Sequence, residues 1–192
     1  RESVQEGLAS LGSNMLRIHP GAVRTRGIAL QAGAVTRITL EDVDAILAIP
    51  SVLRVSPSVT GRAQLVYGNK NWNTRLQGNG VSYAEMRAAV PIAGRFFTEN
   101  EVKNKGRVAC LGITAARELF DETDPVGKII RINRVEFTVL GVMPQKGSFR
   151  GWDQDDIITV PVTTAMYRLM GLDYVEAIDV EVKETSQMEQ AK

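Results

Sequence analysis

Few side chains in the sequence have the types and spacings that catalysis requires. His19 is the only histidine among 192 residues, and it stands just before Pro20 at the end of a predicted strand. A histidine acts as a general base only when a reacting group lies within hydrogen-bond reach. Residues 80–84 (Gly-Val-Ser-Tyr-Ala) approximate a nucleophile elbow around Ser82, but the motif requires Gly at the last position. We therefore predict no catalytic residue. A small α/β hydrolase, using Ser82 or the acidic segment 153–156 with His19, stays an alternative.

Two glycine-containing segments approximate phosphate-binding loops. Gly78-Asn79-Gly80 begins like a dinucleotide fingerprint, but Tyr83 occupies the position of the third glycine. Gly127-Lys128 resembles the end of a P-loop, but Ile129 stands where Ser or Thr is required and Glu122 where the first glycine is required. We therefore predict no nucleotide-binding residue and no cofactor.

The densest acidic segment is Asp153-Gln154-Asp155-Asp156. A calcium loop of the EF-hand type requires Gly at position six and Glu at position twelve, and these positions hold Ile158 and Thr164. The segment is predicted to be an exposed turn, and no residue is predicted to bind a metal. Cys110 is the only cysteine, so an intramolecular disulfide or a CxxC site is excluded. Its apolar neighbours predict a buried strand in which the thiol packs as a small hydrophobic group.

The composition is that of an ordinary globular protein, with 44% hydrophobic and 23% charged residues. Lys and Arg number 23 and Asp and Glu 22, so the net charge is +1. This balance gives no basic surface for nucleic acid. No run approaches the roughly 20 apolar residues of a membrane-spanning helix. The chain begins at Arg1 without a signal peptide, and we interpret it as a piece of a larger protein.

The first elements predicted along the chain form a strand–helix–strand unit. A capping-box helix over residues 3–11 precedes a strand over Met15–His19. Residues 27–33 are predicted to be a loop. Thr39-Leu40-Glu41-Asp42 predicts the start of a helix that Pro50 ends. Val52–Ser56 is the returning strand.

The middle of the chain is predicted to contain a hairpin and two short helices. Strands over Gln64–Tyr67 and Trp72–Gln77 flank Gly68-Asn69, a plausible hairpin turn. A short helix is predicted over Tyr83–Arg87. The sequence Thr98-Glu99-Asn100-Glu101 has the capping-box pattern of a second helix.

The remaining chain alternates strands and helices. Asn133-Arg134 is a predicted tight turn, and Gly171 a predicted helix end. Ile178, Val180 and Val182 alternate with polar residues, which predicts a half-buried strand packed on the helix that begins at Leu40. Strands are predicted over 107–111, 128–132, 137–142 and 157–160, and helices over 114–120, 163–170 and from 186 onward.

The order of short motifs is more informative than any one of them. The series comprises Leu11-Gly12-Ser13-Asn14-Met15-Leu16 with Pro20-Gly21, then Leu40–Val43, Val52–Pro57, Gly94-Arg95-Phe96-Phe97-Thr98, Val108–Gly112, Glu118–Phe120, Asp124–Lys128, Phe137–Val142, Asp155-Asp156 and Val160-Pro161. This series resembles the extracytoplasmic, periplasmic core domain of MacB-type, FtsX-like ABC transporter permeases.

The resemblance implies an α+β fold with two subdomains. A porter-like βαβ module would be built from both chain ends, residues 1–78 and 174–192. A mixed α/β subdomain over residues 79–173 would be inserted between them. In the family a complete helix and a further strand follow the segment that resembles 178–182. This sequence stops at Lys192, so we expect the C-terminal part of the module to be incomplete.

The resemblance also implies a non-catalytic role. The domain would lie on the periplasmic face of the inner membrane, between the first and second transmembrane helices of the permease. It would transmit ATP-driven motion in export and contact a periplasmic adaptor or the substrate. Its expected partners are its own transmembrane helices and ATPase domain, a second copy in a homodimer, and the adaptor; nucleic acid is not expected. A standalone periplasmic binding module stays an alternative.

Overall fold

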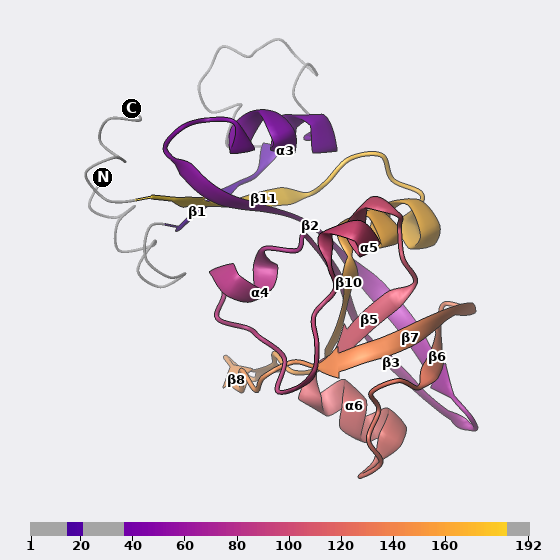
Figure 1. The fold of residues 1–192 in the computed structure, drawn as a ribbon. Coiled ribbons are helices and arrows are strands. Elements are labelled where there is room, and N and C mark those ends of the chain that lie inside the picture. Colours follow the sequence, from indigo (N-terminus) through magenta and orange to yellow (C-terminus); the bar gives the residue numbers. More distant parts are fainter. Residues whose placement is uncertain (1–14, 21–36, 184–192) are drawn as a thin grey trace. The chain divides into compact units, whose positions relative to one another are not determined.

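The computed structural model describes residues 15–20 and 37–183 of the chain. The fold is a mixed α/β arrangement, and the chain divides into two compact units (Figure 1). Unit 1 comprises residues 1–58 and 172–192, and unit 2 comprises residues 59–171. The helices predicted over 3–11 and from 186, and the loop predicted over 27–33, lie outside the described residues. Among the helices that the structure describes, none is long and apolar enough to cross a membrane.

Unit 1 contains the predicted strand–helix–strand sequence. It consists of β1 (Met15–Ile18), α3 (Leu40–Leu47), the first part of β2 (Val52–Tyr67) and β11 (Ala177–Val182). Strand β11 pairs antiparallel with both β1 and β2, and α3 lies over this sheet (Figure 1). The capping box at Thr39 is confirmed: its backbone N–H donates to the Asp42 carboxylate at 2.9 Å, and its hydroxyl accepts from the Asp42 N–H.

Strand β11 is buried on both faces, and the prediction of a half-buried strand is therefore wrong. Ile178 and Val180 are buried as expected, but Asp179 is only 5% exposed. Arg17 of β1 lies opposite Asp179 and donates to its carboxylate at 3.0 Å. Arg54 of β2 lies opposite Glu181 and donates to it at 2.7 Å. Cross-strand ion pairs on both flanks thus cover the polar face.

Strand β2 is one continuous strand of 16 residues, although two separate strands were predicted over 52–56 and 64–67. Pro57 follows the first predicted strand and lacks the backbone N–H that a ladder bond requires. The Ser58 carbonyl accepts from Glu176, so Ser58 directs its backbone groups toward β11. Successive residues alternate sides along a strand, so the nitrogen of Pro57 is turned away from β11 and no ladder bond is lost.

Unit 2 is built around a closed barrel of six strands: β2, β3 (Lys70–Asn79), β10 (Ile157–Pro161), β5 (Val108–Leu111), β7 (Val135–Val142) and β6 (Ile129–Ile132). Strand β6 pairs with both β7 and β2, which closes the sheet. The barrel is mixed, because β10 runs parallel to β3 and β5 parallel to β7. Ile158 lies opposite both Leu76 and Leu111, and all three side chains are almost fully buried on the inner face.

The helices of unit 2 lie at most of the predicted positions. They are α4 (Tyr83–Met86), α5 (Glu99–Lys103), α6 (Ile113–Phe120) and η2 (Thr164–Met170). Helix α6 buries Ala115, Leu119 and Phe120, as predicted. The helix predicted over 163–170 is wound as a π-helix, and it ends at Gly171 in the left-handed conformation. Three strands of two residues each, β4 (Ala93–Gly94), β8 (Ser148–Phe149) and β9 (Trp152–Asp153), were not predicted.

Both predicted hairpin turns of the barrel are confirmed. Strands β2 and β3 are joined across Gly68, which has a φ of +61°. Strands β6 and β7 are joined by Asn133 and Arg134, with φ values of +50° and +75°. Two consecutive positive φ angles define the turn type that fits the twist of a hairpin, and Gly is favoured at its second position. Arg134 therefore occupies a position that suits glycine better.

We expect Arg134→Gly to stabilise the chain by about 0.5 kcal/mol, because glycine adopts a positive φ without steric cost. The measurement is the free energy of unfolding from denaturant titration. The matched control is Arg131→Gly within β6, which should destabilise by about 1 kcal/mol, since glycine in a strand interior loses more conformational freedom. Equal losses for both variants would contradict the turn geometry.

Candidate functional site

The two residues considered for nucleophilic catalysis lie in different compact units. His19 follows β1 in unit 1 and is exposed, while Ser82 precedes α4 in unit 2. Ser82 does not cap the helix with its side chain. Neither position shows the nucleophile–base hydrogen bond that identifies a catalytic pair.

The acidic segment 153–156 is not a fully exposed turn, which corrects that prediction. Asp155 is only 6% exposed, and its carboxylate accepts hydrogen bonds from the backbone N–H groups of Lys146 and Gly147 at 2.7 and 3.0 Å. These bonds hold both ends of the β8–β9 hairpin together. The Asp153 carboxylate accepts from the Thr114 hydroxyl at 2.7 Å.

Asp156 is also used by the chain itself. Its carboxylate accepts from the Trp72 indole N–H at 2.8 Å and from the Thr74 hydroxyl at 2.6 Å. The segment therefore tethers β8–β9 to β3 and α6. Within the described ranges, no group of three His, Cys, Asp or Glu side chains is arranged to hold a metal ion.

Gly78 and Gly127, which belong to the two segments that approximate phosphate-binding loops, each have a structural role in the fold. A Cβ on Gly78 would lie 2.7 Å from the Ala165 Cβ, so glycine here allows η2 to pack against β3. Gly127 has a φ of +88° in the turn before β6. The ammonium group of Lys128 donates to the Asp124 carbonyl at 3.3 Å within the same turn.

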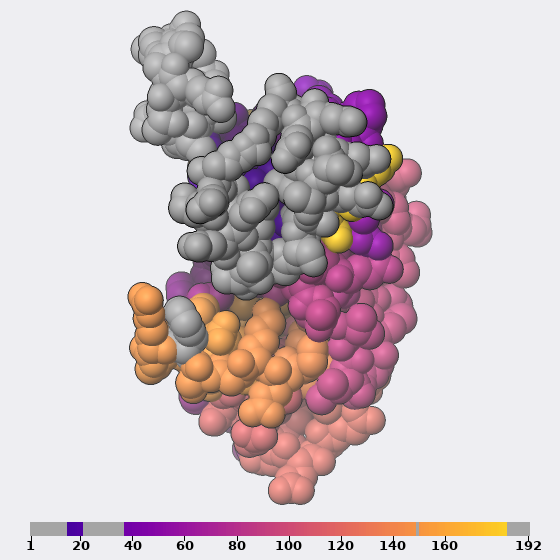
Figure 2. All heavy atoms as spheres, turned by 90° about the vertical axis from the view of Figure 1, so that its left-hand side faces the viewer, coloured from indigo at the N-terminus to yellow at the C-terminus, as the bar shows by residue number. Residues whose placement is uncertain are grey.

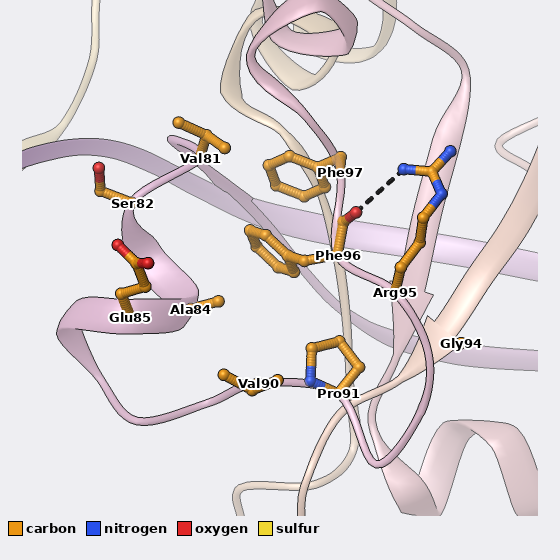
Figure 3. A pocket seen from close by; sticks show the side chains of 10 residues that line it. All are labelled: Val81, Ser82, Ala84, Glu85, Val90, Pro91, Gly94, Arg95, Phe96 and Phe97. Atoms are coloured by element: carbon orange, nitrogen blue, oxygen red, sulfur yellow. Dashed lines mark hydrogen bonds between the residues drawn. The ribbon is translucent and has the colours of Figure 1, made fainter.

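A hollow of about 440 Å³ opens on unit 2 between α4 and the segment that follows it (Figure 3). We call it the α4 groove. Apolar side chains form most of its wall, and Glu85 and Arg95 are its charged members. Its lining residues are Val81, Ser82, Ala84, Glu85, Val90, Pro91, Gly94, Arg95, Phe96 and Phe97.

The α4 groove depends on two glycines whose backbones approach closely where β4 pairs with β7, a contact that we call the glycine crossing. In the pairing of β4 with β7, Gly94 lies directly opposite Gly141. A Cβ on Gly141 would lie 2.5 Å from the Ala93 carbonyl oxygen, and one on Gly94 would lie 2.0 Å from the Leu140 carbonyl oxygen. Real Cβ atoms do not approach backbone oxygens so closely. Only glycine at both positions lets β4 approach β7 this closely within the sheet, where Ile92 and Arg95 donate their N–H groups to the Val142 and Leu140 carbonyls.

The two phenylalanines after this crossing divide between core and surface. Phe97 is 2% exposed and belongs to a small outer core with Tyr83, Leu140 and Met143. Phe96 is half-buried, with its ring centroid 4.0 Å from that of Phe97 and 6.2 Å from that of Tyr83. The aromatic wall of the groove is therefore continuous with the core beneath it (Figure 3).

Cys110 of β5 contacts the 93–97 segment from the barrel side. Its thiol is fully buried in the outer core and donates to the Arg95 carbonyl, with 3.4 Å between sulfur and oxygen. Burial raises the pKa of the Cys110 thiol to about 12. The thiolate is the reactive form of cysteine, so the native thiol is inert at neutral pH. The prediction that Cys110 packs as a hydrophobic residue is confirmed.

An ion pair between Arg95 and Glu101 connects the 93–97 segment to helix α5. The guanidinium donates two hydrogen bonds to the Glu101 carboxylate, at 3.1 and 2.9 Å, and a third to the Phe96 carbonyl. Glu101 also accepts the Thr98 N–H at 2.8 Å, so the capping box predicted for α5 is confirmed. The hydrogen bonds that Arg95 donates to Glu101 lower the pKa of the Glu101 carboxyl group and raise the pKa of the Arg95 guanidinium.

Helix α4 is also attached to the segment that carries β8 and β9. The Tyr83 hydroxyl accepts from the Lys146 ammonium group at 2.7 Å. In Figure 2 the magenta spheres around α4 and the orange spheres of this segment lie side by side on one face.

Sequence reasoning placed Glu101 in the capping box of α5, but it assigned no role to Gly141 or Glu85. Gly141 carried a usable signal, because a glycine inside an otherwise apolar strand often marks a close backbone approach. The partner of that approach, however, is 47 positions earlier in the sequence at Gly94. No local pattern connects the two.

The fold is similar to solved domains of ABC-type transporters. The periplasmic region of MacB from Actinobacillus actinomycetemcomitans superposes with a TM-score of 0.76 at 23% identity, covering 98% of this chain and 85% of that chain. The extracellular domain of the transporter YknZ from Gram-positive bacteria superposes with a TM-score of 0.70 at 20% identity, covering 92% and 86%. At these identities the likeness shows a shared fold.

Sequence comparison gives the particular family. The family model of the MacB-like periplasmic core domain matches residues 1–192, and the chain belongs to this family. It is 49% identical over 187 residues to the macrolide export ATP-binding/permease protein MacB of Bdellovibrio bacteriovorus, covering 97% of this chain. It is 45% identical over 191 residues to the protein of the same name from Chlorobium luteolum, covering 99%. The chain spans about 29% of the length of each of these relatives.

We expect Gly141→Ala to destabilise the chain by about 2–3 kcal/mol, because the added methyl group meets backbone atoms that cannot move aside. The matched control is Gly61→Ala in β2, where the new methyl group would meet only the flexible end of Met170 at 3.3 Å. Denaturant midpoints of both variants provide the comparison. Equal midpoints would show that the crossing tolerates a side chain.

We expect native Cys110 to resist alkylation by iodoacetamide at pH 9. An exposed thiol with a pKa of 9.0 is half ionised there, whereas a pKa of about 12 leaves the buried thiol protonated. Because the native pKa is raised, stability from the buried thiol is complete below pH 9 and is lost as the pH rises toward 12. The same chain in guanidinium chloride is the control and should react fully. Rapid labelling of the folded chain would contradict the burial.

Proposed function

We propose that this chain is the extracytoplasmic domain of an ABC transporter permease that acts in export or efflux, and that it is itself non-catalytic. The observation that carries this proposal is a match over 97% of the chain to 29% of a relative named a macrolide export ATP-binding/permease protein. One domain without an ATP-binding motif, matched to a longer ATP-binding and permease protein, fits a division of labour within that protein. ATP hydrolysis would take place outside this chain.

We further propose that the chain ends form the porter-like βαβ module (residues 1–78 and 174–192) and that residues 79–173 form the inserted subdomain. The pairing of β1 with β11, which come from opposite ends of the chain, supports a module built from both ends. The ion pairs from Arg17 to Asp179 and from Arg54 to Glu181 hold these distant segments in register. A module built from both chain ends would receive motion from the transmembrane helices that precede and follow it in the transporter sequence.

The proposed role is mechanical. ATP hydrolysis in the transporter would move its transmembrane helices, and this domain would pass the movement to the substrate and to a periplasmic adaptor. Two copies would act together in a homodimeric transporter on the periplasmic side of the inner membrane. The alternative of a standalone binding module predicts a secretion signal and no flanking membrane helices.

The first experiment is to read the complete gene on both sides of these 192 residues. Apolar helices of about 20 residues before and after the chain, with an ATP-binding domain in the same or a neighbouring gene, are expected. A signal peptide followed by this domain alone would contradict the proposal.

The second experiment expresses the full-length protein in an efflux-deficient bacterium. It should raise the macrolide concentration that stops growth, and a variant without residues 1–192 should lose this effect. A variant with an inactive ATPase site is the control for energy dependence. Resistance that persists without the domain would show that it has no part in transport.

A further inference from the structure

We propose that the outer face of the unit 2 barrel around Arg75 and Trp152 binds a sugar chain that carries carboxylate groups. This assignment goes beyond the mechanical role proposed above and does not depend on it. It rests on a guanidinium group without an acceptor, an exposed indole ring stacked on it and a row of exposed amide side chains beside it. We call this surface the Arg75 platform, and it comprises Arg62, Gln64, Asn71, Asn73, Arg75 and Trp152.

Arg75 of β3 is a half-buried arginine whose guanidinium has no acceptor. Its neighbours Thr74 and Leu76 are almost fully buried, so Arg75 itself points outward from the barrel. Its Nε atom is buried and has no hydrogen-bond partner. Among the residues that the structure describes, no carboxylate lies within ion-pair distance of this guanidinium. Buried polar groups in folded proteins nearly always have a partner, so Arg75 indicates an acceptor supplied from outside the chain.

The positive charge of Arg75 is only partly offset by its surroundings. Burial lowers the pKa of the Arg75 guanidinium, and the nearby charge of Arg62 lowers it further. Tyr83 and Asp156 act in the opposite direction, but the Asp156 carboxylate already accepts two hydrogen bonds from other side chains of β3. Arg62 donates to the amide oxygen of Asn73 at 3.2 Å. Two neighbouring arginines with no carboxylate bound to either favour an anion, and a carboxylate fits the planar fork of a guanidinium.

Trp152 of β9 provides an open aromatic face on this surface. The guanidinium carbon of Arg75 lies 4.1 Å from the centroid of the Trp152 ring, and Trp152 is 43% exposed. The next residue, Asp153, attaches β9 to α6 by accepting from the Thr114 hydroxyl at 2.7 Å. An exposed indole presents a flat apolar surface. The C–H face of a pyranose ring stacks on such a surface, while the hydroxyl and carboxylate groups of the sugar extend from the edge of its ring.

A row of amide side chains continues the platform along β2 and β3. Asn73 and Arg75 are two residues apart on β3 and therefore share its outer face. The Asn73 amide donates to the Gln64 amide oxygen at 3.2 Å, and the Gln64 amide donates to Asn71 at 3.3 Å. All three amide side chains are exposed. An amide both donates and accepts, as sugar hydroxyl groups do. An acidic peptide would use the arginines alone, whereas a carboxylated sugar chain would use the arginines, the indole and the amides.

The experiment titrates the 192-residue chain by calorimetry with three probes. Trigalacturonate carries three carboxylates on three sugars, its trimethyl ester has the same sugars without the charge, and triglutamate has carboxylates without sugars. We expect trigalacturonate to bind at least about tenfold more tightly than either of the others, as hydrogen bonds to a charged group allow. No binding of trigalacturonate, or equal affinity for the acid and its ester, would overturn the proposal. Binding of triglutamate that is as tight as that of trigalacturonate would assign the platform to an acidic peptide and would also overturn it.

Two variants separate the contribution of charge from that of stacking. Arg75→Gln should remove the preference for the acid over the ester, and Trp152→Ala should weaken binding of both. The matched control is Arg107→Gln, which removes an exposed arginine just before β5 and should behave as the unaltered chain. The ratio of the two affinities is measured within each variant, so a change in stability does not by itself alter it.

A preference that survives Arg75→Gln, or that Arg107→Gln abolishes equally, would overturn the assignment to this platform. Binding that is unchanged in Trp152→Ala would overturn the stacking of a sugar ring. Failure here leaves the proposed transport role unaffected, because that role is tested by export from cells.

Discussion

The close contact between the backbones of Gly94 and Gly141 is the constraint on which the position of the 93–97 segment and the α4 groove depends. Strand β4 is hydrogen-bonded to β7 as its antiparallel neighbour in the same sheet. At this pairing the two backbones approach so closely that a Cβ on either glycine would collide with a carbonyl oxygen. The chain that follows is therefore held against the barrel, where a buried thiol and a cluster of apolar side chains can fix it.

This constraint gives a physical role to each residue of Gly94-Arg95-Phe96-Phe97-Thr98. The glycine makes the crossing, Arg95 binds the carboxylate that also caps α5, and Thr98 is the cap itself. Phe97 enters the outer core, while Phe96 remains at the surface as a wall of the α4 groove. One short segment thus connects the barrel, the start of α5 and the α4 groove. A substitution at any of its residues is therefore expected to shift the positions of the others.

Local features of the fold could be predicted from the sequence. The capping boxes at Thr39 and Thr98 and the turn at Asn133-Arg134 depend on neighbouring residues alone, and the structure confirms them. Features that depend on distant partners were missed. The predicted strand ended at Ser56, because the alignment of the following residues against β11 is not visible locally. Asp155 was expected in solvent, because nothing in the sequence indicates that the Lys146 and Gly147 N–H groups bind its carboxylate. The α4 groove could not be predicted for the same reason, because the need for glycine at position 94 arises only from its pairing with Gly141.

Hydrogen exchange at the Arg95 amide tests most directly whether the glycine crossing holds this segment, because this amide donates to the Leu140 carbonyl at 3.1 Å beside the crossing. If the crossing holds the segment as part of the barrel, this amide should exchange only through global unfolding. Its rate should then match that of the Met143 amide, which donates to Leu111 at 2.8 Å at the end of β5. Exchange of Arg95 far faster than Met143, with a weak dependence on denaturant, would show that the segment opens by itself and would contradict the account.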